Sequence, residues 1–285
     1  MNDFREVMMT TARQFYDQQP DLAVVSEKDW PTMYDLPSEY PEEPGLPDVY
    51  HDLQPQLLSA TLQIPKVEPE QIFTGTDLNV YYDREHPRWH KRPDWFAVVG
   101  VPYLYAGHDM RLSYVVWDEQ ASPSVVVELI SPGTASSDLG KIKREPDGLP
   151  TKWQVYEDYL QIPYYVVYDR YQDRLWIFKW IEGKYQEQEV GEFRYWMEDL
   201  EMGLGLWQGE FQGITRPWLR WFDAQGAWIL TEVERERSQR LQADQRAETE
   251  ARRAAMERQQ RQAADRKAER LAARLRELGV DPDAV

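Results

Sequence analysis

The sequence predicts an α/β protein whose core is a β-sheet flanked by helices. Short segments rich in β-branched and aromatic residues lie between turn residues, as strands do. One of them, VVVELI, has apolar residues on both faces, which is typical of a central strand covered on both sides. A helical pattern falls between two of these strands, and the order strand, helix, strand favours an α/β sheet. The predicted strands are residues 76–82, 94–99, 112–117, 124–130, 164–168 and 174–180.

Two helices are predicted beside these strands. Residues 51–62 place apolar side chains three and four positions apart, and Pro55 is tolerated because it falls in the first turn. Residues 151–160 repeat the same spacing, with Thr151 as the expected N-cap. Residues 20–50 are rich in Pro, Asp and Glu, which predicts an irregular segment laid over the domain.

The C-terminal part of the chain differs in composition from the rest. Residues 232–278 contain no Gly or Pro, and their 13 basic and 10 acidic side chains are typical of a long solvated helix. We therefore predict two parts, 1–231 and 232–285, and expect the second to be dispensable for folding of the first. Two interpretations of the tail stay open: a single charged helix, or a coiled-coil arm that joins copies of the chain.

Composition restricts the classes of function. The chain has no cysteine, which excludes disulfides and thiolate zinc sites, so that a metal would need oxygen or imidazole ligands. Charges interrupt the N-terminal residues and no apolar run approaches the length of a membrane span, so we expect a cytoplasmic protein without membrane partners. The formal net charge of -17 argues against a simple polyanion binder.

Glu128 is the most informative residue of the predicted core. An acid inside an apolar strand costs several kcal/mol unless it is paired, protonated or bound to a cation. Asp94 begins another predicted strand, and two carboxylates on neighbouring strands suit Mg²⁺. The alternative is structural, with Asp94 capping a turn and Glu128 paired with an arginine.

Five blocks of sequence follow one another in a characteristic order: KRPDWFAVV, VVVELISPGT, DLG, KWQVY and PYYVVYD, which begin at residues 91, 125, 138, 152 and 163. Together these blocks resemble the Uma-two family of endonucleases. That family belongs to the restriction-endonuclease-like superfamily, which is named for its PD-(D/E)-x-K motif. The resemblance covers roughly residues 30–210 and implies a restriction-endonuclease-like mixed β-sheet flanked by helices, to which this chain adds the long C-terminal helix.

The resemblance implies roles for individual residues. Asp94 and Glu128 correspond to the metal-binding acids of the superfamily motif. The motif lysine would stand two residues after the acid, where this chain has Ile130. In members of the Uma-two type the lysine comes instead from the following helix, in a Lys-x-x-x-Tyr arrangement that Lys152 and Tyr156 reproduce. Lys152 is therefore the expected catalytic lysine.

Two features of the motif stay open. The chain inserts KIKREPDGLP before the helix, so Lys141 and Lys143 are rival candidates for the catalytic lysine. Superfamily members often add an upstream acid to the metal shell. The candidates for that acid here are Glu39, Glu42, Glu43 and Asp77.

The expected function is that of a metal-dependent endonuclease that hydrolyses phosphodiester bonds of DNA with Mg²⁺ or Mn²⁺. RNA or a small nucleotide is an alternative substrate. An alternative from another class is an inert binding or scaffold protein that keeps the fold and works through its C-terminal helix, which could also form a homo-oligomer. The acidic body favours the scaffold, whereas Asp94, Glu128 and Lys152 favour the enzyme.

Overall fold

The computed structural model of the chain describes residues 48–130, 138–141 and 149–278. The predicted irregular segment at 20–50 lies almost entirely outside these residues. The chain divides into two compact units, 1–52 and 53–285, and the architecture is that of the second. No helix in the described part is both long and apolar enough to cross a membrane.

The largest sheet has six strands and is mixed, as predicted. Strands β6 and β7 are parallel neighbours at its centre, and every other neighbouring pair is antiparallel. The two central strands are buried at every position, which explains their near-continuous apolar sequences. In spatial order the strands are β1 (Ile72–Thr76), β4 (Trp95–Val99), β6 (Val125–Leu129), β7 (Tyr164–Asp169), β8 (Arg174–Ile181) and β9 (Lys184–Glu187).

Two smaller sheets and several short helices accompany it. The first small sheet has the order β3-β2-β5 and the second the order β10-β11-β12. Their strands are β2 (Val80–Tyr81), β3 (His90–Lys91), β5 (Tyr114–Val115), β10 (Arg194–Met197), β11 (Met202–Phe211) and β12 (Ile214–Phe222). The short helices are η2 (Pro69–Gln71), α3 (Val116–Glu119) and η4 (Glu198–Leu200).

Two predicted strands are wrong in extent. The strand predicted at 76–82 is instead the end of β1 and the whole of β2. Strand β1 ends at Thr76, because Asp77 takes a left-handed conformation with φ of 47°, and strand pairing resumes only at β2. The strand predicted at 112–117 is only β5, because the chain then turns into α3. Strand β3 and strands β9 to β12 were not predicted.

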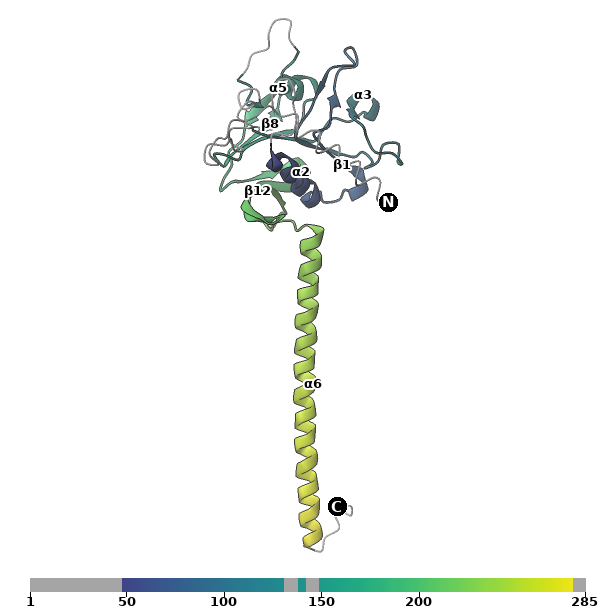
Figure 1. Cartoon of the computed structure of the whole chain (residues 1–285), viewed down its shortest axis with the longest axis vertical. Coiled ribbons are helices and arrows are strands. Elements are labelled where there is room, and N and C mark those ends of the chain that lie inside the picture. The colour runs from purple at the N-terminus through teal and green to yellow at the C-terminus, as the bar shows by residue number, and fades with distance from the viewer. Residues whose placement is uncertain (1–47, 131–137, 142–148, 279–285) are drawn as a thin grey trace, which may run out of the picture. The chain divides into compact units, whose positions relative to one another are not determined.

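Alternation along the strands gives the large sheet two different faces. Residues such as Phe96 and Val126 belong to one buried cluster together with Val155 and Tyr156, which follow α5 (Lys152–Gln154). On the opposite face Trp95 packs 6.0 Å from Trp221 of β12, measured between ring centroids. That face also contacts α2 (Val49–Thr61), where Ser59 accepts a hydrogen bond from the Trp95 indole. Figure 1 shows α5 and α2 on opposite sides of the sheet.

The helix predicted at 151–160 is α-helical only in its first turn. Thr151 is its N-cap, as predicted, and forms a capping box with Gln154. The helix continues as a π-helical turn, η3 (Val155–Tyr159), in which Leu160 donates its backbone hydrogen bond to Val155, five residues earlier. The extra residue in this turn is a local departure from the predicted periodicity.

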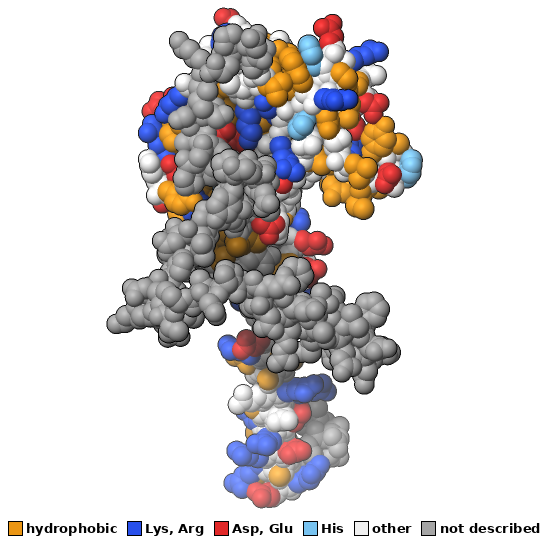
Figure 2. Space-filling model, turned by 45° about the horizontal axis from the view of Figure 1, so that its top comes forward, with side chains coloured by type: hydrophobic (Ala, Val, Ile, Leu, Met, Phe, Trp, Pro, Cys, Tyr) orange, Lys and Arg blue, Asp and Glu red, His pale blue; other side chains and the backbone are white. Residues whose placement is uncertain are grey.

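The tail is a single helix, α6 (Glu232–Glu277), close to the predicted range. A capping box of Thr231 and Glu234 begins it, and none of its residues is buried. Figure 2 shows acidic and basic side chains intermixed over the visible part of α6. Its first turn is tied to β12, because the buried Arg220 guanidinium forms an ion pair with Glu234.

Candidate active site

Two carboxylates lie opposite each other on neighbouring strands of the large sheet. Strands β4 and β6 are antiparallel with Trp95 paired to Val127, and extending that register by one residue sets Asp94 against Glu128. Both side chains belong to the α5 face, because alternation puts Asp94 with Phe96 and Glu128 with Val126. The Leu129 amide donates to Asp94 Oδ2 at 2.6 Å, and the Asp94 amide lies 3.4 Å from Glu128 Oε2.

The helix on this face supplies two groups to Glu128. Lys152 and Tyr156 are four residues apart, so they point to the same side of the helix. Lys152 Nζ donates to Glu128 Oε2 at 2.8 Å, and the Tyr156 hydroxyl donates to Oε1 at 2.8 Å. The structure thus brings Asp94, Glu128 and Lys152 together at one end of the large sheet.

Burial sets the electrostatics of this cluster. Glu128 is fully buried, and loss of solvation raises its pKa to about 8, against the lowering effect of the Lys152 ammonium. Desolvation would lower the pKa of Lys152, but the charges of Glu128, Asp94 and Asp138 outweigh it and raise that pKa. Lys152 therefore stays a cation, and its side chain keeps 24% of its surface exposed. It links a buried acid to solvent.

Among the other candidate lysines and acids, only Asp77 is found beside the site in the described part of the chain. Lys141 is exposed and forms no ion pair with either acid in the described part of the chain, while Lys143 lies outside it. Asp77 does lie beside the site, since its amide donates to the Asp94 carbonyl at 3.3 Å. Burial raises the pKa of Asp77 and the Asp94 charge adds to this, whereas Arg92 at 3.2 Å lowers it. The other upstream acids, Glu39, Glu42 and Glu43, lie outside the described residues.

Asp138 is a member of the cluster that sequence reasoning missed. It is 2% exposed, and its charge helps to raise the pKa of both Glu128 and Lys152. Gly140, two residues later, has φ of 66°, and a Cβ there would lie 2.6 Å from Trp153 Cδ2. Only glycine lets this segment pack so closely on the first turn of α5. The block DLG in the sequence was the available signal.

The donor set fits a hard divalent cation. Both acids offer carboxylate oxygens, the ligands that Mg²⁺ and Mn²⁺ prefer, from strands whose backbone pairing fixes their spacing. No cluster of three or more His, Cys, Asp or Glu suited to a metal ion occurs among residues 48–130, 138–141 and 149–278. A cation at Asp94 and Glu128 would therefore complete its shell with water and a substrate phosphate, as Mg²⁺ commonly does.

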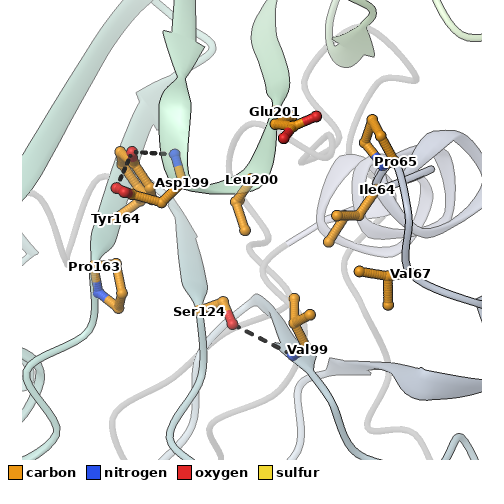
Figure 3. A pocket seen from close by; sticks show the side chains of 10 residues that line it. All are labelled: Ile64, Pro65, Val67, Val99, Ser124, Pro163, Tyr164, Asp199, Leu200 and Glu201. Atoms are coloured by element: carbon orange, nitrogen blue, oxygen red, sulfur yellow. Dashed lines mark hydrogen bonds between the residues drawn. The ribbon is translucent and has the colours of Figure 1, made fainter.

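A cavity of about 240 Å³ lies at the other end of the sheet (Figure 3). It is bounded by Val99 and Ser124, which stand at the ends of β4 and β6 remote from the two acids. Its Tyr164 hydroxyl donates to Asp199 Oδ2 at 2.6 Å, and Lys179 lies 3.1 Å from the same oxygen. Because these polar groups satisfy one another, the candidate active site remains the cluster around Glu128.

Comparison with known proteins identifies a family and a similar solved structure. The family model "Uma2: Putative restriction endonuclease" matches residues 33–211. No curated protein matches the chain. A crystal structure described as a "putative nuclease belonging to DUF820", from Anabaena variabilis ATCC 29413, is similar at 9% identity with a TM-score of 0.35. That similarity covers 50% of this chain and 69% of the other.

Proposed function

Because the chain belongs to the Uma2 family, a family of restriction-endonuclease type, we propose that it is a metal-dependent endonuclease that hydrolyses phosphodiester bonds of DNA. The observation that supports this is the convergence of Asp94, Glu128 and Lys152 at one end of the sheet. Asp94 and Glu128 would hold Mg²⁺ or Mn²⁺. When bound, the cation polarises a phosphoryl oxygen and acidifies a bound water.

Lys152 is the proposed catalytic lysine. It stays protonated, and its partly exposed ammonium can turn from Glu128 towards a substrate phosphate in the adjoining solvent. There it would orient the attacking water or stabilise the negative charge that develops on the phosphoryl oxygens.

Hydrogen bonds fix the orientation of the Glu128 and Asp94 carboxylates. The Tyr156 hydroxyl holds one oxygen of Glu128, which leaves the other for Lys152 or a cation. The hydrogen bond from the Leu129 amide fixes the Asp94 carboxylate. Burial raises the pKa of Tyr156 well above its usual value, so its hydroxyl remains a neutral donor. Catalytic oxygens are thus positioned before substrate arrives.

Cleavage assays test the proposal. Single-stranded DNA, duplex DNA and RNA are incubated with Mg²⁺, Mn²⁺ or EDTA and the wild-type, Glu128→Gln and Lys152→Gln proteins. We expect metal-dependent cleavage by the wild type and losses of roughly 100-fold or more in each variant. Glu210→Gln, an exposed acid on β11, is the control and should cleave normally. Cleavage that survives Glu128→Gln contradicts the proposed site.

The scaffold alternative has its own supporting observation. Helix α6 is 46 residues long with no buried residue, so its surface is available to another copy or another protein. Apolar residues recur at alternating steps of four and three, the spacing of a coiled-coil seam, in Ala264, Ala268, Leu271 and Leu275 of the helix and Leu278 at its C-cap. Sedimentation of the full chain and of a chain lacking α6 tests this. Self-association lost with α6, together with no cleavage of any nucleic acid, would favour the scaffold over the enzyme.

A further inference from the structure

Lys91 lies on a continuation of the strand pair that carries Asp94. Ile72 pairs with Val99 in the ladder of β1 and β4, and Val80 pairs with Lys91 in that of β2 and β3. In both ladders the residue numbers of the two partners add up to the same value, as they do along a single antiparallel pair. The two ladders therefore share one antiparallel register, and strand pairing is interrupted between them. Lys91 stands three residues before Asp94, at most about 11 Å away between Cα atoms. It extends the end of the sheet where the acids converge.

The Lys91 ammonium has no counter-charge among the described residues. The residue is half-buried, yet it forms no hydrogen bond or ion pair with any described side chain. Its neighbour Arg92, by contrast, pairs with Asp77 at 3.2 Å. A partly buried lysine without such a pair is unexpected in a chain with 50 acidic and 33 basic residues.

The surroundings of Lys91 favour an anion as its missing partner. Burial lowers the pKa of Lys91, and the nearby Lys152 ammonium lowers it further. Two ammonium groups near each other repel, and an anion beside both would relieve the repulsion and the desolvation together. A metal ion would increase the repulsion, so Lys91 is suited to a phosphate and not to the cation.

We propose that Lys91 binds a backbone phosphate of the nucleic acid next to the scissile one, and so positions the strand across Asp94, Glu128 and Lys152. This inference rests on the proposed function. It explains how an acidic protein can accept a polyanion, since Lys91, which no described acid neutralises, offers a cation beside the acids of the site. Lys91 is a positioning residue, because no reacting atom needs to touch it.

Binding measurements test the proposal. Fluorescence anisotropy with labelled single-stranded and duplex DNA is carried out over a range of salt concentrations, with Glu128→Gln as the non-cleaving background. Adding Lys91→Gln should weaken binding about tenfold and lower the slope of log affinity against log salt by about 0.9 for duplex or 0.7 for single strands. Lys91→Arg, which keeps the charge, should restore most of the affinity. Melting of each variant verifies folding.

Lys179→Gln is the matched control. It removes the same charge from a partly buried lysine of the large sheet. Lys179 lies opposite Tyr164 in the ladder of β7 and β8, at the end of the sheet remote from Glu128. It should change neither affinity nor salt slope. In cleavage assays on the otherwise wild-type chain, Lys91→Gln should raise KM with kcat within about twofold, whereas Lys152→Gln should lower kcat.

The outcomes separate this inference from the proposed function. If the wild type cleaves DNA and Lys91→Gln binds with unchanged affinity and salt slope, the role of Lys91 is wrong and the nuclease stands. If the wild type binds no nucleic acid, both are wrong. If wild type and Lys91→Gln bind DNA differently as expected but neither cleaves it, the phosphate site stands and the catalytic proposal fails.

Discussion

Substitution of Glu128 by Gln separates a metal ligand from a structural acid. The side chain is fully buried and accepts hydrogen bonds from Lys152 and Tyr156, each at 2.8 Å. Glutamine keeps the shape, because its oxygen can still accept from Lys152 while its amide donates to the Tyr156 hydroxyl. It cannot carry the negative charge that a divalent cation needs. The variant should therefore fold but should not gain stability from Mg²⁺.

The size of the effect comes from linkage. A cation present at about 100 times its dissociation constant stabilises the folded state by about 2.7 kcal/mol if it binds only that state. For a folded domain of this length, that free energy corresponds to a rise in Tm of roughly 5–10 °C. We expect this rise in the wild type and in Glu210→Gln, and its absence in Glu128→Gln.

The same pair of proteins without metal gives a pH test. The folded-state pKa of Glu128 is raised to about 8 from an ordinary value of 4.5. The resulting stabilisation is complete below pH 4.5 and is lost as pH rises to about 8, because ionising a buried carboxyl opposes folding. Glutamine does not titrate. The Tm of Glu128→Gln relative to wild type should therefore increase from pH 4.5 to 8.

Thermal melts from about pH 4.5 to 8.5, with and without Mg²⁺, give both results. An equal metal-induced shift in wild type and Glu128→Gln would refute the reasoning, since the cation would then bind elsewhere and Glu128 would be a structural acid. A Tm difference that does not change with pH would contradict the raised pKa.

Three further predictions concern folding. In a fragment that ends just before α6, the buried Arg220 has lost its partner Glu234, so the free energy of unfolding should fall by about 1–3 kcal/mol. A fragment that keeps the first two turns of α6 should unfold in urea like the full chain. The pKa of Glu234 is lowered from its ordinary value of 4.5, because hydrogen bonds from Arg220 and from its own helix cap outweigh desolvation. The stability that the Arg220–Glu234 pair contributes should therefore be lost as pH falls below 4.5. Acid unfolding of wild type and Glu234→Gln measures this loss, which only the wild type should show. Gly140→Ala should displace Trp153 and with it Lys152, which lowers both Tm and cleavage, whereas Gly183→Ala, with open space around it, should affect Tm only through its backbone strain.

The central part of the fold could be predicted because its signals are local. An acid in an apolar strand identified Glu128, and the four-residue spacing of Lys152 and Tyr156 placed both on one side of a helix. Their meeting follows from alternation in β6 and from the helix that covers that face. The family resemblance supplied the link between Lys152 and the acids, which spacing alone could not give.

Other parts depend on pairing between distant residues. Strands β10 to β12 escaped prediction partly because β11 contains several glycines, which are poor strand formers. The structure explains one of them: a Cβ at Gly203 would lie 2.0 Å from Phe222 Cζ, so an aromatic ring covers the bare backbone. The approach of Asp138 to Glu128, and of Lys91 to Lys152, likewise depends on tertiary packing that no local pattern encodes.

The π-helical turn η3 has a consequence for how this region could change. Tyr156 faces Glu128, while the next residue, Glu157, accepts from the Tyr185 amide of β9 at 2.7 Å. Two consecutive side chains of this turn therefore contact a buried acid and an edge strand. Deleting one residue after Tyr156 would restore α-helical geometry and rotate the downstream residues of the turn by about 100°. The contact of η3 with β9 would then be lost while Lys152 and Tyr156 keep their contacts with Glu128. The turn η3 is therefore the point at which the residues of the site connect to the edge of the sheet.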